Sequence, residues 1–275
     1  DLSMRFDIAV SSAYADSAAV TVTVDGNAVM ENVSYASLAD GVTGCKKFAL
    51  DMAAAQMSDE IVITISDGNT VLTQKSYTVR DYIKTLIEGN YDEKLQALAK
   101  AALNYGAGAQ VYFDHHADTL ANAGYETTET VAIPEINTDN MVSGEVSGIR
   151  FYGASLVYNS KIAVRFYFDV TGDISNYTFS MGNEPVLKDG LYYVEIDGIN
   201  PQDYAKDIVL TVSDGENEMA VTYSPMYYLG RMYGKTENQS LKNLLVAMYQ
   251  YHLAAVEYLT EEPEVTYRGE EIVVG

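Results

Sequence analysis

An internal repeat is the feature of this sequence that most constrains its fold. Residues 59–68 align with residues 206–215, and residues 76–113 align with residues 222–259 without a gap. The second alignment pairs identical residues, namely Tyr77 with Tyr223, Tyr82 with Tyr228, Leu95 with Leu241, Leu98 with Leu244, Ala101 with Ala247, Tyr105 with Tyr251, Ala109 with Ala255 and Tyr112 with Tyr258. Matches that keep one order along the chain are typical of a duplicated structural unit. We therefore expect two copies of one module of about 115–120 residues rather than one large domain.

The repeat also places the expected domain boundaries. We expect a first module over residues 1–120, a linker over 121–145, a second module over 146–260 and a strand-like tail over 261–275. The second module begins with an additional strand, expected over residues 149–156, which the first module lacks. A sheet edge carries unpaired backbone groups, so we expect that the tail can pair with the edge of either module.

Two hydrophobic periodicities follow one another within each copy. Apolar residues at every second position predict strands, as in residues 20–24, 61–65 and 208–212. Apolar residues three and four positions apart predict helices over 79–88 and 92–113, and Ser224-Pro225 opens the equivalent helix of the second copy. Strands followed by helices predict an α+β fold. The expected architecture is two related modules, each a small antiparallel β-sheet or sandwich followed by two helices.

Charge and hydropathy exclude two classes of protein. The chain has 39 acidic residues against 17 Lys and Arg, which gives a net charge of −22. Phosphate binding needs a basic surface, so this balance argues against a nucleic-acid partner. No apolar run approaches the roughly 20 residues of a membrane-spanning helix, so we expect no membrane span. The single Cys45 excludes a disulfide framework, and we expect it to be a small residue at a strand edge.

Motifs that carry catalysis are missing from the sequence. It has no Gly-rich phosphate loop, no nucleophile elbow and no His-Glu-x-x-His motif. Carboxylate pairs such as Glu195 and Asp197 do not stand out from the other acidic residues. We therefore predict no catalytic residues and no cofactor, and expect that the chain is not an enzyme.

The one histidine cluster, His115-His116, directly follows the long helix predicted for the first copy. Adjacent side chains generally point apart, and a zinc site needs three or four converging ligands. The matching stretch of the second copy has no histidine. We therefore expect a solvated helix end and no metal, with a weak metal site as the alternative. His252, which aligns with Gly106, has no evident role.

Tyrosine is unusually frequent, with 23 Tyr against 7 Phe and no Trp. Tyrosines on the helical stripes are expected in the core. Two pairs, Tyr192-Tyr193 and Tyr227-Tyr228, are the candidate ligand-binding residues, because neighbours on a strand face opposite sides and one of Tyr192 and Tyr193 is then exposed. An exposed tyrosine offers an amphipathic surface for a sugar or a protein partner. Packing in the core or between the modules is the alternative for these pairs.

Several segments together resemble a known kind of bacterial module. The segments are residues 48–60, 77–82, 101–113, 149–156, 192–196 and 244–258. They resemble tandem accessory modules of large secreted or cell-surface proteins of Gram-positive gut anaerobes, which occur beside dockerins, leucine-rich repeats or carbohydrate-active enzymes. The resemblance implies an extracellular or cell-wall-attached location, and it supplies no catalytic residues.

These observations favour a binding or structural role. The predicted function is a non-catalytic extracellular module pair for adhesion, spacing or protein–protein contact on a bacterial surface protein. The alternative is a carbohydrate-binding module that assists the attachment to, or degradation of, a polysaccharide. The expected partners are accordingly a surface protein or a polysaccharide.

Overall fold

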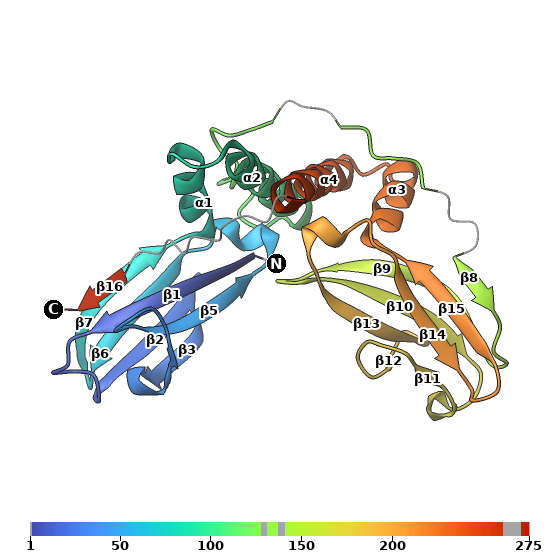
Figure 1. Ribbon diagram of the computed structural model, residues 1–275, viewed down its shortest axis with the longest axis horizontal. Coiled ribbons are helices and arrows are strands. Elements are labelled where there is room, and N and C mark those ends of the chain that lie inside the picture. Colours follow the sequence, from blue (N-terminus) through green and yellow to red (C-terminus); the bar gives the residue numbers. More distant parts are fainter. Residues whose placement is uncertain (1, 128–130, 137–140, 261–270, 275) are drawn as a thin grey trace. The chain divides into compact units, whose positions relative to one another are not determined.

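The computed structural model describes residues 2–127, 131–136, 141–260 and 271–274 (Figure 1). The chain divides into two compact units. We call residues 2–127 with the tail strand at 271–274 the N-terminal unit, and residues 128–260 the C-terminal unit. Each unit contains two four-stranded sheets and a pair of α-helices.

Two sheets form the β-sheet part of the N-terminal unit. The first has the order β16 (Glu271–Val274), β1 (Leu2–Val10), β5 (Lys46–Met52) and β4 (Ala39–Asp40). The second has the order β3 (Asn27–Ser34), β2 (Ala18–Val24), β6 (Ile61–Asp67) and β7 (Thr70–Tyr77). Neighbouring strands are antiparallel except β1 and β16, which are parallel.

Alternating apolar residues build the core between these two sheets. In β2 and in residues 61–65 of β6 every second residue is a buried Ala, Val or Ile, while the residues between them are partly exposed. Phe6 of β1 stacks on Phe48 of β5 with ring centroids 5.2 Å apart, and it meets Tyr77 of β7 at 5.5 Å. Because Phe6 contacts both sheets, it joins them into one core.

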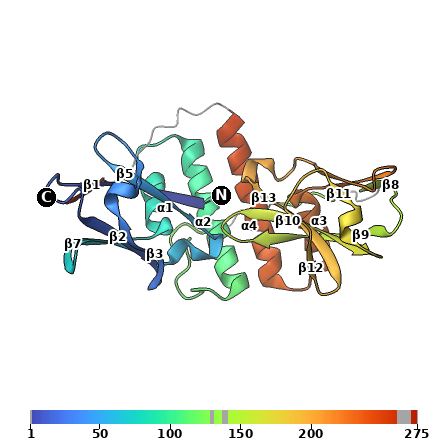
Figure 2. The same cartoon turned by 90° about the horizontal axis from the view of Figure 1, so that it is seen from below.

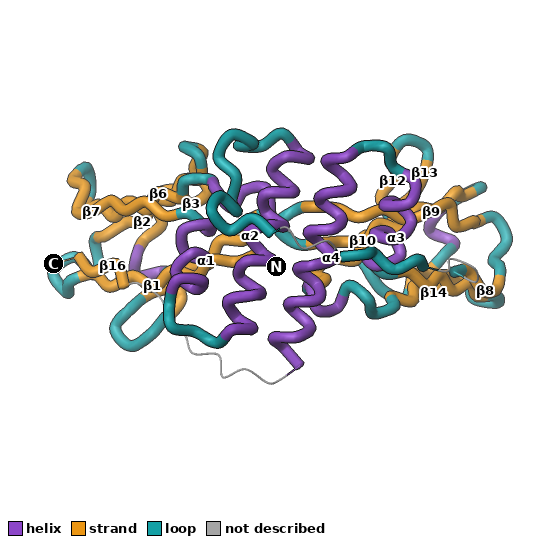
Figure 3. The backbone as a smooth tube through the Cα atoms, turned by 90° about the horizontal axis from the view of Figure 1, so that it is seen from above, coloured by secondary structure: helices purple, strands orange, loops and turns teal. Residues whose placement is uncertain are grey.

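The helices of the N-terminal unit begin where the sequence predicts them. Helix α1 (Val79–Glu88) is capped by Thr78, whose hydroxyl accepts a hydrogen bond from the backbone N–H of Asp81 at 2.9 Å. Helix α2 (Glu93–Phe113) follows Asp92, which caps it in the same way. Figure 2 and Figure 3 show α1 and α2 side by side at one end of the strands. The short 3-10 helix η2 (Ala54–Ser58) packs against α2, and a second one, η1 (Tyr35–Ser37), precedes β4.

The C-terminal unit also has two sheets. The first has the order β12 (Val186–Lys188), β13 (Leu191–Ile199), β10 (Ile162–Val170) and β9 (Ile149–Tyr158). The second has the order β11 (Thr178–Phe179), β14 (Ile208–Ser213), β15 (Glu218–Tyr223) and β8 (Val142–Gly144). Two phenylalanines of β10 contact the second sheet. The ring centroid of Phe166 is 6.1 Å from that of Tyr223 in β15, and the ring centroid of Phe168 is 5.5 Å from that of Phe179 in β11.

Helix α3 (Pro225–Lys235) follows β15 directly, and the long helix α4 (Gln239–Thr260) ends this unit. Ser224 caps α3 by accepting a hydrogen bond from the N–H of Tyr227, as the Ser-Pro pair predicts. Two 3-10 helices, η3 (Ile174–Asn176) and η4 (Pro201–Asp203), complete the unit, and η4 packs on α4. Within the described residues, no helix is both long and apolar enough to cross a membrane.

The predicted α+β class is wrong, because the described residues are mostly β-sheet. Four sheets account for more residues than the four α-helices. The prediction missed strands such as β3 and β12, whose residues are mostly exposed and therefore show little apolar alternation.

The chain is also not clearly two modules in succession. The tail strand β16 returns to the N-terminal unit and pairs with β1, at the edge that corresponds to the pairing of β9 with β10. Strand β8, which pairs with β15, comes from the segment expected to be a linker. The remaining tail residues 261–270 lie outside the described part.

Candidate functional site: a tyrosine-lined pocket

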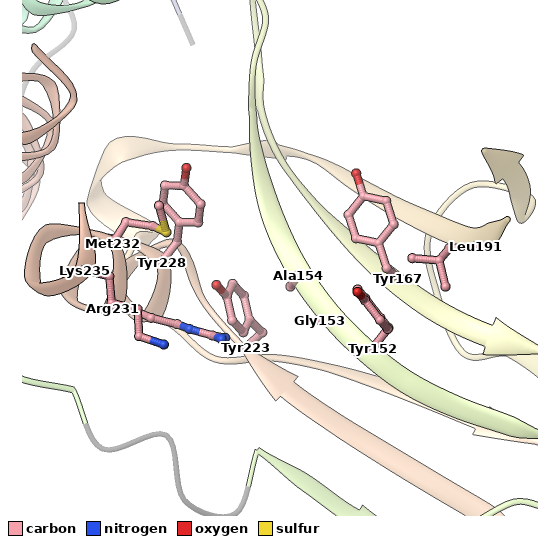
Figure 4. A pocket seen from close by; sticks show the side chains of 10 residues that line it. All are labelled: Tyr152, Gly153, Ala154, Tyr167, Leu191, Tyr223, Tyr228, Arg231, Met232 and Lys235. Carbon is pink, nitrogen blue, oxygen red and sulfur yellow. The ribbon is translucent and has the colours of Figure 1, made fainter. Parts of the chain in front are cut away.

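An open pocket of about 420 Å³ lies on the C-terminal unit (Figure 4). Its walls come from β9, β10 and β13 on one side and from α3 and the end of β15 on the other. The lining residues are Tyr152, Gly153, Ala154, Tyr167, Leu191, Tyr223, Tyr228, Arg231, Met232 and Lys235. Four of these side chains are tyrosines, and Figure 4 shows Tyr152 and Tyr167 projecting from neighbouring strands while Tyr228 and Arg231 project from α3.

A β-bulge sets the position of Tyr152. Gly153 pairs with Tyr167 and Phe151 pairs with Phe168, so Tyr152 is the additional residue between two regular pairs. A bulge changes the direction in which a strand presents its side chains. Tyr152 is 65% exposed, which makes it the most accessible of the large aromatic side chains at the pocket.

The strand side of the pocket is a row of cross-strand neighbours. Tyr167 lies opposite Gly153 on one side and opposite Tyr193 on the other. The rings of Tyr167 and Tyr193 are 5.7 Å apart, and the Ser155 hydroxyl donates a hydrogen bond to the Tyr167 oxygen at 3.4 Å. Because Gly153 has no side chain, the face of Tyr167 remains accessible from its side of the row.

Helix α3 contributes the opposite wall through one of its faces. Tyr228, Arg231, Met232 and Lys235 are spaced by three and four residues, so they share a helix face. Arg231 and Lys235 are exposed, and neither has an ion-pair partner among the residues that the structure describes. In a chain of net charge −22, these two cations form a local positive site.

The floor of the pocket is Tyr223, which is almost fully buried. Burial raises the pKa of the Tyr223 hydroxyl, and the nearby Arg231 opposes that rise. The hydroxyl is therefore neutral at physiological pH and can act as a hydrogen-bond donor. Together the pocket offers flat apolar rings, hydroxyl groups and two cations, which suits a polar ring that carries an anionic group.

The structure divides the four predicted ligand-binding tyrosines. Tyr228 lines the pocket, and Tyr193 lies beside the lining residue Tyr167. Tyr192 pairs with the buried Phe168 and so belongs to the other face of the sheet. Tyr227 stacks on Tyr223 with ring centroids 5.7 Å apart, which is a packing role.

The sequence alone does not single out several of the lining residues. The spacing of Tyr228, Arg231 and Lys235 on one helix face was a readable signal for the cationic wall. Nothing in the sequence marks the bulge that exposes Tyr152, because a bulge depends on the pairing of two strands. Of the carboxylates considered, Glu195 pairs with Arg165 at 2.6 Å on the sheet surface and lines no part of this pocket.

The structure places the three histidines in two different settings. His115 and His116 lie close to two carboxylates, those of Asp25 and Asp59, in the N-terminal unit. The expectation that these neighbouring imidazoles point apart is wrong, because their rings are 4.7 Å apart and both reach a carboxylate. His252 has a packing role, since it is buried and its Nδ1 lies 2.6 Å from the carbonyl oxygen of Pro201.

No family model, curated protein or solved structure matches this chain.

Proposed function

We propose that this chain is a non-catalytic binding protein of a bacterial cell surface or secreted assembly, and that its tyrosine-lined pocket binds an acidic carbohydrate. The observation that carries the proposal is the combination of exposed Tyr152, the rings of Tyr167 and Tyr228, and the two cations of α3 around one open pocket.

The tyrosines of the pocket are the reason for proposing a carbohydrate ligand. A sugar ring has apolar faces that pack on an aromatic ring and hydroxyl groups that exchange hydrogen bonds with tyrosine hydroxyls. An open pocket accepts one or a few sugar units of a long chain without enclosing its ends. These properties favour the carbohydrate-binding alternative, and attachment to polysaccharide would also serve the adhesion predicted from the sequence.

Arg231 and Lys235 account for the acidic character of the ligand. A guanidinium group forms two parallel hydrogen bonds with a carboxylate or sulfate, and an ammonium group adds a second positive charge. A neutral polysaccharide would leave both cations without a partner at the pocket. We therefore expect a preference for sugars that carry a carboxylate or a sulfate.

Affinity electrophoresis on acidic and neutral polysaccharides tests the proposal. We expect retardation of the protein in gels that contain polygalacturonate, alginate or hyaluronan, and little retardation in dextran, which carries no charge. The double variant Arg231→Gln/Lys235→Gln should bind at least about tenfold more weakly, because each charge-assisted hydrogen bond contributes roughly 1.5–3 kcal/mol. Tyr152→Ala should weaken binding to a similar degree.

Two variants serve as matched controls. Arg150 is an exposed arginine that pairs with Asp169 on β10, and Tyr233 is an exposed tyrosine of α3 that does not line the pocket. Arg150→Gln and Tyr233→Ala should bind like the wild type. A lack of retardation on every polysaccharide, or equal losses in the pocket and control variants, would reject carbohydrate binding at this pocket.

A further inference from the structure

A cluster of two histidines and two aspartates lies in the N-terminal unit, apart from the pocket of the C-terminal unit. We call Asp25, Asp59, His115 and His116 the His–Asp cluster. One ligand atom from each residue lies within 4.8 Å of all the others. His115 Nε2 is 2.7 Å from Asp59 Oδ1, and His116 Nε2 is 2.5 Å from Asp25 Oδ2 and 3.8 Å from Asp59 Oδ1.

Three separate segments bring the cluster together. Asp25 begins the turn after β2, Asp59 follows η2, and the histidines follow α2. The backbone of Asp25 and that of Glu60 are hydrogen-bonded to each other at 3.0 Å, and Asp25 Oδ1 also accepts the N–H of Glu60. The turn that carries Asp25 is therefore fixed next to Asp59.

The loop after α2 turns both imidazoles toward these carboxylates. Asp114 and His116 have φ angles of 54° and 48°, which lie in the left-handed region. These two residues turn the chain after α2, so the side chains of His115 and His116 both face the carboxylates instead of pointing apart. The fully buried Gln110 holds the loop, because its side-chain oxygen accepts the N–H of Ala121 at 2.7 Å and its amide donates to the carbonyl of Thr119. The two imidazoles are thus positioned by backbone and by a buried side chain.

Charge within the cluster favours a bound cation. Asp59 is only 1% exposed, and Asp25 and Asp59 each place a carboxylate oxygen next to an imidazole nitrogen. A buried carboxylate is costly unless a positive charge lies beside it. A divalent cation among the four ligand atoms would balance the negative charges of both carboxylates.

We infer that the His–Asp cluster is a zinc-binding site with four protein ligands: His115 Nε2, His116 Nε2 and one carboxylate oxygen each from Asp25 and Asp59. Zinc–nitrogen and zinc–oxygen bonds of about 2.0–2.1 Å in a tetrahedron separate the ligand atoms by about 3.3 Å. The separations of 2.5, 2.7 and 3.8 Å lie on both sides of this value. Small side-chain rotations therefore convert the hydrogen-bonded arrangement into the coordinated one.

The donor set distinguishes zinc from magnesium and calcium. Those two ions prefer oxygen ligands and six or more of them, whereas imidazole nitrogen suits zinc and its neighbours in the first transition series. The side chains of His115 and His116 are 37% and 41% exposed, so an ion has access to the cluster from solvent.

Calorimetric titration of the full chain with zinc, after treatment with a chelator, tests the inference. We expect one zinc ion per chain, with a Kd that 10 mM magnesium or calcium does not change. Coordinated imidazole must be free of its Nε2 proton, so binding near pH 6.5 should release protons. Titrations in two buffers of different ionisation enthalpy measure this release. Binding without proton release, or no saturable binding of one zinc per chain, would overturn the inference.

Conservative variants test the four ligands. His115→Gln and His116→Gln should each weaken zinc binding by about 100-fold or more, because loss of an outer-shell partner alone typically costs 10–100-fold. Asp16→Asn removes an exposed carboxylate of the same unit that is no part of the cluster, and it should bind zinc like the wild type. Cobalt titration gives a second measurement on each folded variant, since tetrahedral cobalt absorbs strongly in the visible range. Unchanged zinc affinity in both histidine variants would contradict the proposed ligands.

Discussion

In each unit a 3-10 helix packs against the long helix, η2 on α2 and η4 on α4, but the two contacts use very different residues of the long helix. In the N-terminal unit, α2 presents Gly106 to Met57 of η2, and a Cβ atom at Gly106 would lie 2.4 Å from Met57 Sδ. In the C-terminal unit, α4 presents His252, which lies opposite Gly106 in the sequence match. The His252 ring stacks on Tyr204 at a centroid distance of 5.9 Å, and its Nδ1 donates to the carbonyl oxygen of Pro201.

This difference teaches how to separate a structural histidine from a ligand. His252 is buried, and its ring nitrogen is used by a backbone carbonyl. His115 and His116 are partly exposed and face carboxylates, so a metal ion can reach their ring nitrogens from solvent and find anionic ligands beside them. The same residue type thus stabilises packing in one unit and offers coordination chemistry in the other.

The largest expected effect on stability comes from replacing Gly106 of the N-terminal unit with histidine, the residue that the C-terminal unit has at the matching position. Gly106→His should lower the free energy of unfolding by about 3 kcal/mol, because the new side chain overlaps buried Met57 and approaches the carbonyl oxygen of Ala54. Urea unfolding followed by circular dichroism measures the loss. Gly234→His is the control, since Gly234 of α3 has open space around it and should change stability by less than about 0.5 kcal/mol. Equal stability of the two variants would show that Gly106 is not required for this contact.

A smaller loss is expected when the hydrogen bond of His252 is removed without removing its ring. His252→Phe keeps the aromatic volume beside Tyr204 but leaves the Pro201 carbonyl without its donor, which should cost about 2 kcal/mol. The affinity for zinc should stay unchanged, because His252 is no member of the His–Asp cluster. Increased stability would mean that packing outweighs the hydrogen bond, and a change in zinc affinity would contradict the division between structural and ligating histidines.

Local patterns in the sequence explain which parts of the fold were predictable. Alternation in β2 and β6 and the spacing in α1 and α2 predicted those elements, because each buries one face. The short edge strands β4, β11 and β12 bury little and leave no pattern. The tail was expected to pair with the edge of either module, and β16 does pair with β1 at a sheet edge. Local periodicity does not report which of the two units the tail joins.

The candidate sites were less predictable than the helices. The tyrosine pairs pointed to the C-terminal unit and to the pocket residue Tyr228, but the exposure of Tyr152 depends on a bulge between β9 and β10. In the His–Asp cluster, Asp25 and His116 are separated by 91 positions in the sequence. Only the packing of η2, α2 and the turn after β2 brings them together, so the sequence showed two adjacent histidines without their carboxylate partners.

The pH dependence of stability should show the protonation of the His–Asp cluster in zinc-free protein. The hydrogen bond with Asp25 raises the pKa of His116 above 6.5, and Asp59 and Asp118 add to this shift. The stabilisation is then fully present below about pH 6.5 and is lost as the pH rises through the pKa of folded His116. Unfolding by urea between pH 6 and pH 8.5 should therefore show a decline that is weaker in His116→Gln. An identical decline in that variant would assign the pH dependence to other groups.

The smallest expected effect on stability belongs to the cationic wall of the pocket. Arg231 and Lys235 are exposed and have no ion-pair partner within the described parts of the chain, so Arg231→Gln/Lys235→Gln should change the free energy of unfolding by less than about 0.5 kcal/mol. The same variant should lose most of its retardation by acidic polysaccharide and keep its affinity for zinc. Salt should likewise weaken the retardation of the wild type by acidic polysaccharide, because ions screen exposed charges over about 8 Å at 0.15 M.

If the variant loses zinc affinity as well, the two sites are coupled and cannot be treated as separate functions of the two units. If it keeps full polysaccharide affinity while Tyr152→Ala does not, the ligand is a neutral sugar held by the rings alone.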